Sequence, residues 1–540
     1  MRGVTLRRVV IAGLAFAGAG PACNGGGGDG SGGGAPVVTV SSPDDRCVPL
    51  PGPFPPGLAT VPGSSSRAVL VNFSPPAAIP FDLDAVPPRV AATGPVPTIP
   101  SDSDGDGRPD LFGPSLDGVD VASGVAWITA SLLEEVLFAD PASGALTRLR
   151  VELPASFAAG DFPLFGLAPG TAALRTAVSS TYCARPDPAG TDSRGVPLST
   201  VLAAGGVCDP GEFPTRFTSG SALAAGRLFV SASNVGDDAG TANTQFLPGT
   251  VLAYDVDRTT VPATVRPVEP SPVIFTTAFN PTQVTAYTSP SGRAYVLVTG
   301  TGALGITQDD PNTPVIDSGG FPLTPSAIDV IEAVSARLVA TVPLGAAALS
   351  FDRLAIDRTG RVAFTGSAAG RNVYAIDLAP LDTLPALAAG APPYVLDGSD
   401  ARVVNVDARI FDAAHPFRLP ARPGGAPAQS CPGFVVGTAF NAFGSKLFAT
   451  DFCDGTLTSV GVDLGGAPPV PVPRDPLRFS VLSSAPVADP IGAGGFGGAR
   501  GLGSILVRPG RPGIDYRGPD VFVTVGSPEG LLCALRVDSF

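Results

Sequence analysis

A recurring unit of strand, tight turn and strand limits the fold of this chain more than any other feature. The unit is clearest in GRLFVSASN (226–234), GRAYVLVTG (292–300) and RTGRVAFTG (358–366). Bulky apolar residues alternate with small ones in these segments, a pattern that predicts strands with a buried face. The turns are 66 to 84 residues apart, at positions 226, 292, 360, 444 and 519. Repetition of such a unit predicts a propeller or a solenoid.

One of these units resembles a known family. The segment LAIDRTGRVAFTGSAAGRNVYAIDL (354–378) looks like one repeat of the bacterial YVTN-type seven-bladed β-propellers. In those repeats a small apolar run precedes a D-x-x-Gly-Arg turn, and a strand and a hydrophobic-Asp pair follow. The resemblance extends loosely over residues 66–540, although the YVTN tetrapeptide itself is absent. It implies an all-β propeller of about seven blades, with six to eight allowed, and a pair of β-sandwiches is the alternative.

The N-terminal segment predicts export. MRGVTLRR is followed by twelve apolar or small residues, VVIAGLAFAGAG, which as a helix span roughly 18 Å and cannot cross a ~30 Å hydrocarbon core. Gly20, Ala22 and Cys23 resemble the lipobox of bacterial lipoproteins, with Gly20 and Pro21 departing from the usual pattern. The resemblance implies that Cys23 is lipidated, and ordinary secretion with cleavage near Ala22 is the alternative.

Three segments follow from these patterns. Residues 1–22 are expected to be a signal peptide, and residues 67–540 a propeller domain. Residues 23–66 begin with the expected lipidated cysteine and a glycine-rich run, and continue with Pro- and Ser-rich chain. Because Gly- and Ser-rich chain is flexible, we expect 23–66 to be a tether that holds the folded body away from a membrane.

The remaining cysteines suggest disulfide bonds. An exported chain with six cysteines besides Cys23 is typical of a protein with three disulfides, although fifteen pairings satisfy the sequence. Free buried thiols at some of these positions are the alternative. The first and last segments of a closed propeller meet, which suits a bond between cysteines near the two ends. Nearness along the chain favours Cys183–Cys208 and Cys431–Cys453, which leaves Cys47–Cys533.

The charge of the chain limits its partners. The net charge is −13, and Lys446 is the single lysine beside 33 arginines. Binding to nucleic acid needs clustered basic residues, so the composition indicates that nucleic acid is not a partner.

A single acidic loop predicts a calcium site. SDSDGDGRPDLFG (101–113) places aspartates at alternate positions, which suits a hard cation that takes six to eight oxygen ligands. The loop at 102–113 resembles the calcium loops of thrombospondin type 3 and FG-GAP repeats, and a solvated acidic turn is the alternative. We expect the ion to be structural, because clustered carboxylates repel one another without a cation. The expected ligands are the side chains of Asp102, Asp104, Asp106 and Asp110 and the carbonyl of Arg108.

The sequence gives little support for an enzyme. His415 is the single histidine and lies beside Pro416, and Trp127 is the single tryptophan, which disfavours the tryptophan-rich propeller families. No nucleophile or nucleotide motif occurs in a credible context, so no catalytic residue is assigned.

These observations favour a non-catalytic binding or scaffold protein anchored by lipid in the bacterial cell envelope, at the outer membrane or cell surface. A lactonase-type propeller hydrolase and a calcium-dependent adhesin are the alternatives. We expect long loops such as 233–249 and 301–325 to gather at the rim, where they would contact a protein or glycan ligand.

Overall fold

The structure is a computed structural model of the chain, and it describes strands and turns between residues 47 and 535. The described residues are 47–50, 57–61, 64–72, 77–91, 96–97, 116–122, 125–130, 135–139, 149–152, 156–158, 212–214, 218–233, 235–237, 244–246, 249–257, 264–269, 272–302, 304–305, 321–322, 326–345, 348, 350, 352–368, 370–403, 406, 416–422, 433–441, 443–463, 478–486, 501–510, 519–526 and 530–535.

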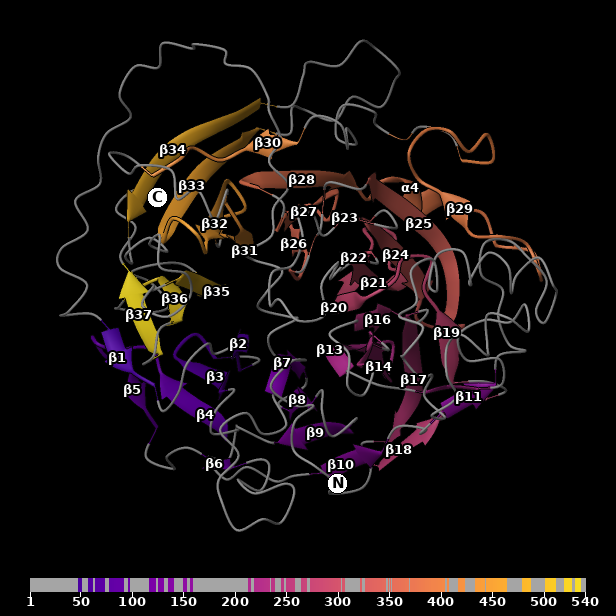
Figure 1. Cartoon of the computed structure of the whole chain (residues 1–540), viewed down its shortest axis with the longest axis horizontal. Helices are drawn as coiled ribbons and strands as arrows, with labels where there is room; N and C mark the ends of the chain where they lie inside the picture. Colours follow the sequence, from indigo (N-terminus) through magenta and orange to yellow (C-terminus); the bar gives the residue numbers. More distant parts are fainter. Residues whose placement is uncertain are drawn as a thin grey trace, which may run out of the picture.

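Among these residues, seven sheets of four or five strands form a ring (Figure 1). Sheet 1 contains β2 (Gly57–Thr60), β3 (Arg67–Asn72), β4 (Ala77–Asp82), β5 (Arg89–Val90) and β6 (Val96–Pro97). Sheet 2 contains β7 (Leu116–Ala122), β8 (Val125–Ala130), β9 (Glu135–Ala139) and β10 (Leu149–Glu152). Sheet 3 contains β13 (Thr218–Ala224), β14 (Arg227–Ala232), β17 (Thr250–Asp257), β18 (Thr264–Pro267) and β19 (Val273–Phe275).

The second half of the chain completes the ring. Sheet 4 contains β20 (Pro281–Thr288), β21 (Ala294–Gly300), β24 (Ser326–Glu332), β25 (Arg337–Gly345) and β29 (Tyr394–Val395). Sheet 5 contains β26 (Ala355–Ile356), β27 (Val362–Gly366), β28 (Asn372–Asp377) and β30 (Phe417–Arg418), with the short helix α4 (Pro380–Thr383) after β28. Sheet 6 contains β31 (Val435–Phe440), β32 (Lys446–Asp451), β33 (Thr456–Asp463) and β34 (Arg478–Pro486). Sheet 7 contains β35 (Gly501–Val507), β36 (Val521–Gly526), β37 (Leu531–Leu535) and β1 (Cys47–Pro49).

The architecture is an all-β propeller, as the repeats predict. The inner strands β2, β7, β13, β20, β26, β31 and β35 surround the centre of the ring (Figure 1). Neighbouring strands within a sheet are antiparallel, except that β29 joins β25 in parallel. The expectation of seven successive units needs correction. Six sheets are each built from one stretch of the chain, apart from β29 and the inserted pairs β15–β16 and β22–β23, and the remaining sheet combines β35–β37 with β1 from the other end of the folded body.

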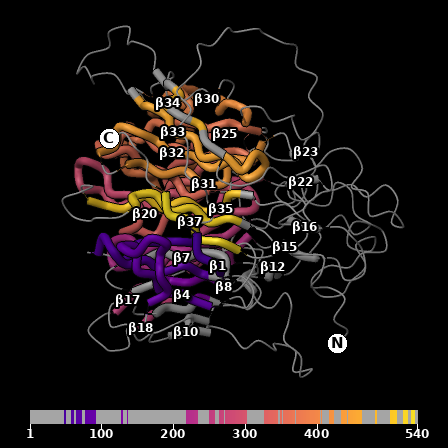
Figure 2. The backbone as a smooth tube through the Cα atoms, turned by 90° about the vertical axis from the view of Figure 1, so that its left-hand side faces the viewer, coloured from indigo at the N-terminus to yellow at the C-terminus, as the bar shows by residue number. Residues whose placement is uncertain are grey.

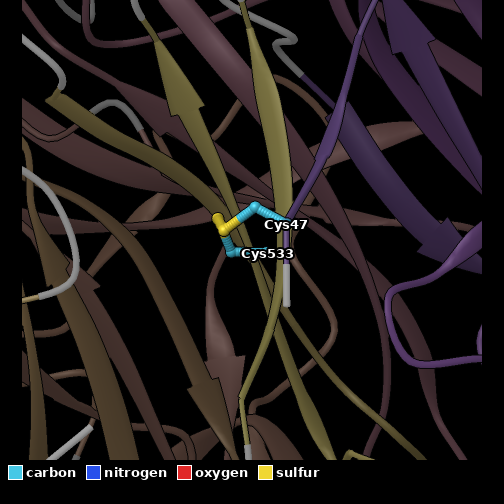
Figure 3. The surroundings of a disulfide bond; sticks show 2 residues. All are labelled: Cys47 and Cys533. Carbon is cyan, nitrogen blue, oxygen red and sulfur yellow. A yellow bond between two sulfur atoms is a disulfide. The ribbon is translucent and has the colours of Figure 1, made fainter. Parts of the chain in front are cut away.

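The disulfide Cys47–Cys533 joins the two ends of the chain, as predicted (Figure 3). Cys47 in β1 lies opposite Cys533 in β37, at a sequence separation of 486 residues. Figure 2 shows β1 and β37 next to each other, and the buried Arg508 also connects sheet 7 to sheet 1 by donating to Asp84 at 2.8 Å. Because β1 and β2 take part in sheets, the folded body begins before the predicted boundary at residue 67.

The core lies between the sheets. Six clusters of buried apolar residues are found in the described part of the chain, each shared by two neighbouring sheets. In β32, Leu447 packs towards sheet 5, whereas the next residue, Phe448, packs towards sheet 7. The sequence pattern predicted one buried face, but this strand is buried on both faces because a sheet stands on each side of it.

The Gly-turn motif forms the connection from the first to the second strand of several sheets. Asp357 accepts hydrogen bonds from the backbone amides of Thr359, Arg361 and Val362, at 2.8, 2.7 and 2.6 Å. Gly360, three residues later, has φ +68°, a conformation that favours glycine. In the equivalent turn of sheet 6, the side-chain oxygen of Asn441 accepts hydrogen bonds from the amides of Ser445 and Lys446, and Gly444 has a positive φ.

We predict that Asp357→Ala lowers the free energy of unfolding by about 2–3 kcal/mol, because it leaves three backbone donors without their acceptor. Asp357→Asn is the matched control, since Asn441 shows that an amide oxygen can hold the same turn. Urea unfolding followed by circular dichroism measures both variants. Equal losses for the two substitutions would contradict this role of the side-chain oxygen.

Candidate functional site

One face of the propeller carries all the two-stranded sheets of the described residues. These are β11 (Ser156–Ala158) with β12 (Glu212–Pro214), β15 (Val235–Asp237) with β16 (Thr244–Phe246), and β22 (Leu304–Gly305) with β23 (Phe321–Pro322). We call this side the hairpin face.

Strand direction explains why the hairpins share a face. The first strand of each sheet runs towards a Gly-turn, and the second strand returns. Connections that leave a second or a fourth strand therefore start at the opposite face from the Gly-turns. The pairs β15–β16 and β22–β23 follow second strands, and β11–β12 follows the fourth strand of sheet 2. The pairs β15–β16 and β22–β23 lie within the loops 233–249 and 301–325, whose gathering at the rim stays a prediction.

Polar side chains converge on the residues before β26. We call Asp352, Arg353 and Leu354 the hub. The amide and the hydroxyl of Thr438 in β31 donate to Asp352 Oδ2, at 2.6 and 2.9 Å. The hydroxyl of Thr299 in β21 donates to the Asp352 carbonyl at 3.0 Å.

The other two hub residues reach further around the ring. The Nε of Arg353 donates to Oε1 of Gln283 in β20 at 3.2 Å, and its Nη2 donates to the carbonyl of Ser221 in β13 at 3.3 Å. The amide of Leu354 donates to Thr285 Oγ1 in β20 at 3.1 Å. Three consecutive residues therefore connect sheets 3, 4, 5 and 6 near their inner strands.

The hub contains a carboxyl group that titrates near neutral pH. Burial raises the pKa of Asp352 to about 7, and the hydrogen bonds from Thr438 and the charge of Arg353 lower it only in part. A carboxyl with such a pKa can exchange a proton or bind a polar ligand.

The residues predicted from the sequence fall mostly elsewhere. Cys453 is disulfide-bonded, and its partner lies outside the described residues. Trp127 is buried between sheets 2 and 3 among apolar side chains. Cys23, Cys183, Cys208, Cys431 and His415 lie outside the described residues, as does the calcium loop with Asp102, Asp104, Asp106, Arg108 and Asp110.

Two searches of the described residues were negative. No helix among them is both long and apolar enough to cross a membrane. No group of three or more His, Cys, Asp or Glu side chains in this part of the chain could hold a metal ion.

Sequence reasoning missed the hub. Asp352 and Arg353 lie in LSFDRLAID (349–357), just before a predicted strand. An aspartate followed by an arginine at this position is typical of an ordinary surface loop. The contacts of Arg353 reach residues 70 and 132 positions away, which no local pattern can reveal.

Among known proteins, the chain is similar to solved structures only at low sequence identity. No protein-family model matches the sequence, and no curated protein matches it. Among solved structures, the β-propeller domain of Cps50 (Swd1) from Myceliophthora thermophila is 9% identical, with a TM-score of 0.41, and the match covers 91% of this chain and 99% of that one. A periplasmic gluconolactonase, PpgL, from Pseudomonas aeruginosa is 16% identical, with a TM-score of 0.33, and the match covers 58% and 65%. A protein of unknown function from Desulfotomaculum acetoxidans is 12% identical, with a TM-score of 0.37, and the match covers 79% and 88%.

Proposed function

We propose that this protein is an exported, lipid-anchored propeller of the bacterial cell envelope that acts as a non-catalytic binding or scaffold protein. The observation that carries the proposal is that the chain order and direction of the strands start every inserted strand pair of the described residues from one face. Insertions on a rigid scaffold are where binding residues concentrate. The ligand proposed for this face is a protein or a glycan.

Export is supported by the disulfide that joins the ends of the folded body. Cys47–Cys533 and the bonded Cys453 are typical of chains that fold in an oxidising compartment. Anchoring at the outer membrane or the cell surface is proposed from the lipobox-like segment that ends at Cys23.

We expect Cys23→Ala to move the protein from the membrane fraction to the soluble envelope fraction, because it removes the atom that would carry the lipid. Cell fractionation followed by immunoblotting measures the distribution. Cys183→Ala is the control for loss of a cysteine as such. Retention of the Cys23→Ala variant in membranes would contradict the anchor.

The binding face can be tested with photo-crosslinking residues placed in living cells. We expect a probe at Gly236 in β15 to capture a discrete partner, whereas a probe at Arg358, in a Gly-turn on the opposite face, captures none. Gel shifts followed by mass spectrometry identify the adducts. Equal capture from both faces would contradict a dedicated binding face.

A lactonase-type hydrolase is the second candidate, and the hub favours it. Near the inner strands, the Arg353 guanidinium contacts the amide oxygen of Gln283, and the neighbouring Asp352 has a carboxyl with a raised pKa. Calcium is proposed as a structural ion of the loop at 102–113, and a calcium-dependent adhesin is the related alternative.

Thermal unfolding of the purified protein with added ligands separates these candidates. We expect calcium to raise the melting temperature, a chelator to reverse the rise, and lactones to have no effect. A shift with a lactone, together with turnover that Asp352→Asn abolishes, would replace the binding function with the hydrolase. Absence of any calcium response would contradict the metal site.

A further inference from the structure

Three hydroxyl groups between sheets 2 and 3 are buried without a hydrogen-bond partner. Thr129 in β8 and both Thr218 and Ser221 in β13 have a relative exposure of 0%. Their side-chain oxygens make no hydrogen bond within the part of the chain that the structure describes. Burial of a hydroxyl without a hydrogen bond is unfavourable, so each of these groups needs a physical explanation.

Thr218 and Ser221 point from sheet 3 towards sheet 2. Because side chains alternate along a strand, Ser221 lies on the same face as Leu223, which packs against the apolar cluster between sheets 2 and 3. Thr218 pairs with Ala232, and Ala232 lies on the same face of β14 as Val230, a member of that cluster. Two hydroxyls of the inner strand of sheet 3 therefore face sheet 2.

Thr129 points from sheet 2 into the same space. It pairs with Val136 in β9 and lies two residues beyond Trp127 in β8, and both of these neighbours belong to the same apolar cluster. In the assembled ring, β8 lies against β13. The hydroxyl of Thr129 therefore faces the strand that carries Thr218 and Ser221.

The position of Thr129 carries a hydrogen bond to the next sheet in two other sheets. In sheets 2, 4 and 6, a threonine of the second strand pairs with the first residue after an irregularity in the inner strand: Thr129 with Gly118, Thr299 with Gln283, and Thr450 with Gly437. The hydroxyl of Thr299 donates to the carbonyl of Asp352, at the start of sheet 5, at 3.0 Å. The hydroxyl of Thr450 donates to the carbonyl of Gly503 in sheet 7 at 2.9 Å. Among the described residues, Thr129 has no such acceptor in sheet 3.

We propose that water is bound between sheets 2 and 3 by the hydroxyls of Thr129, Thr218 and Ser221. A hydroxyl can both donate and accept, and a buried water typically makes about three hydrogen bonds to groups of this kind. Water thus satisfies hydroxyls of both sheets and replaces the direct bond that joins the other sheets. The three ligands are neutral, which suits water and not an ion, because a buried charge needs an opposite charge. This inference does not depend on the proposed function.

The stability of Thr129→Val tests the site, because this substitution nearly keeps the shape of the side chain and removes the hydroxyl. We expect the urea midpoint of unfolding to fall, since the bound water loses a partner. Loss of a dry, unpaired hydroxyl would have the opposite sign, because it removes a buried polar group that nothing satisfies. An unchanged or raised midpoint would therefore overturn the proposal. Thr299→Val is the matched control, because the hydroxyl that it removes donates directly to a carbonyl, and its midpoint should fall.

Oxygen-17 relaxation dispersion of the purified protein detects the water itself. The method counts water molecules that stay bound for longer than the protein takes to rotate. We expect the count to be lower for Thr129→Val than for the wild type, and unchanged for Thr299→Val. The same count in Thr129→Val and the wild type would overturn the proposal, whatever the change in stability.

A second variant keeps the test decisive if Thr129→Val does not fold. Thr218→Val removes a hydroxyl from the other side of the same space. The count of bound water should again be lower than in the wild type. An unchanged count in this variant would count against a site shared by the two sheets.

Discussion

Closure of the ring is the constraint on which the rest of this structure depends. Each sheet buries apolar side chains against its neighbours, so an open ring would leave two faces exposed. The chain meets this requirement by pairing β1 with β37, so that the last sheet contains both ends of the folded body. The Cys47–Cys533 disulfide and the Arg508–Asp84 ion pair lie at this junction. Covalent closure removes the entropy that the separated ends would otherwise gain on opening.

Close approach at the inner strands follows from the choice of small residues. Gly437 in β31 faces Thr450 and the carbonyl of Gly503 at distances of 2.9 and 3.1 Å from an added Cβ. Larger side chains there would push sheets 6 and 7 apart. Hydroxyl groups then form hydrogen bonds between the closely spaced sheets. The hydroxyl of Thr450 in sheet 6, for example, donates to the carbonyl of Gly503 in sheet 7. Clusters of apolar side chains fill the wider parts of the space between neighbouring sheets. Hydrogen bonds thus hold the sheets together where they are close, and apolar packing holds them together where they are further apart.

The fold was accessible from the sequence because its signals are local. The turn at Asp357–Gly360 needs an acceptor and a positive φ within four residues, and both are visible in the letters. The pairing of Cys47 with Cys533 was what nearness along the chain left over, and a closed ring suited it. The contacts between neighbouring sheets could not be predicted from the sequence, because contacts such as that of Asp352 with Thr438 join residues 86 positions apart. Burial of a carboxyl, which gives Asp352 its pKa, is likewise a property of the assembled ring.

Two arginines that follow the glycine of a turn connect neighbouring sheets. Arg227 in sheet 3 donates to the carbonyls of Ala333 and Val334 in sheet 4, and Arg293 in sheet 4 donates to Leu381 and Leu384 beside sheet 5. One planar guanidinium thus satisfies two acceptors on the next sheet while keeping its charge at any physiological pH. A lysine ammonium is a flexible point charge and cannot hold two carbonyls in a fixed geometry. Arg227 and Arg293 therefore each connect their own sheet to the next one in the ring.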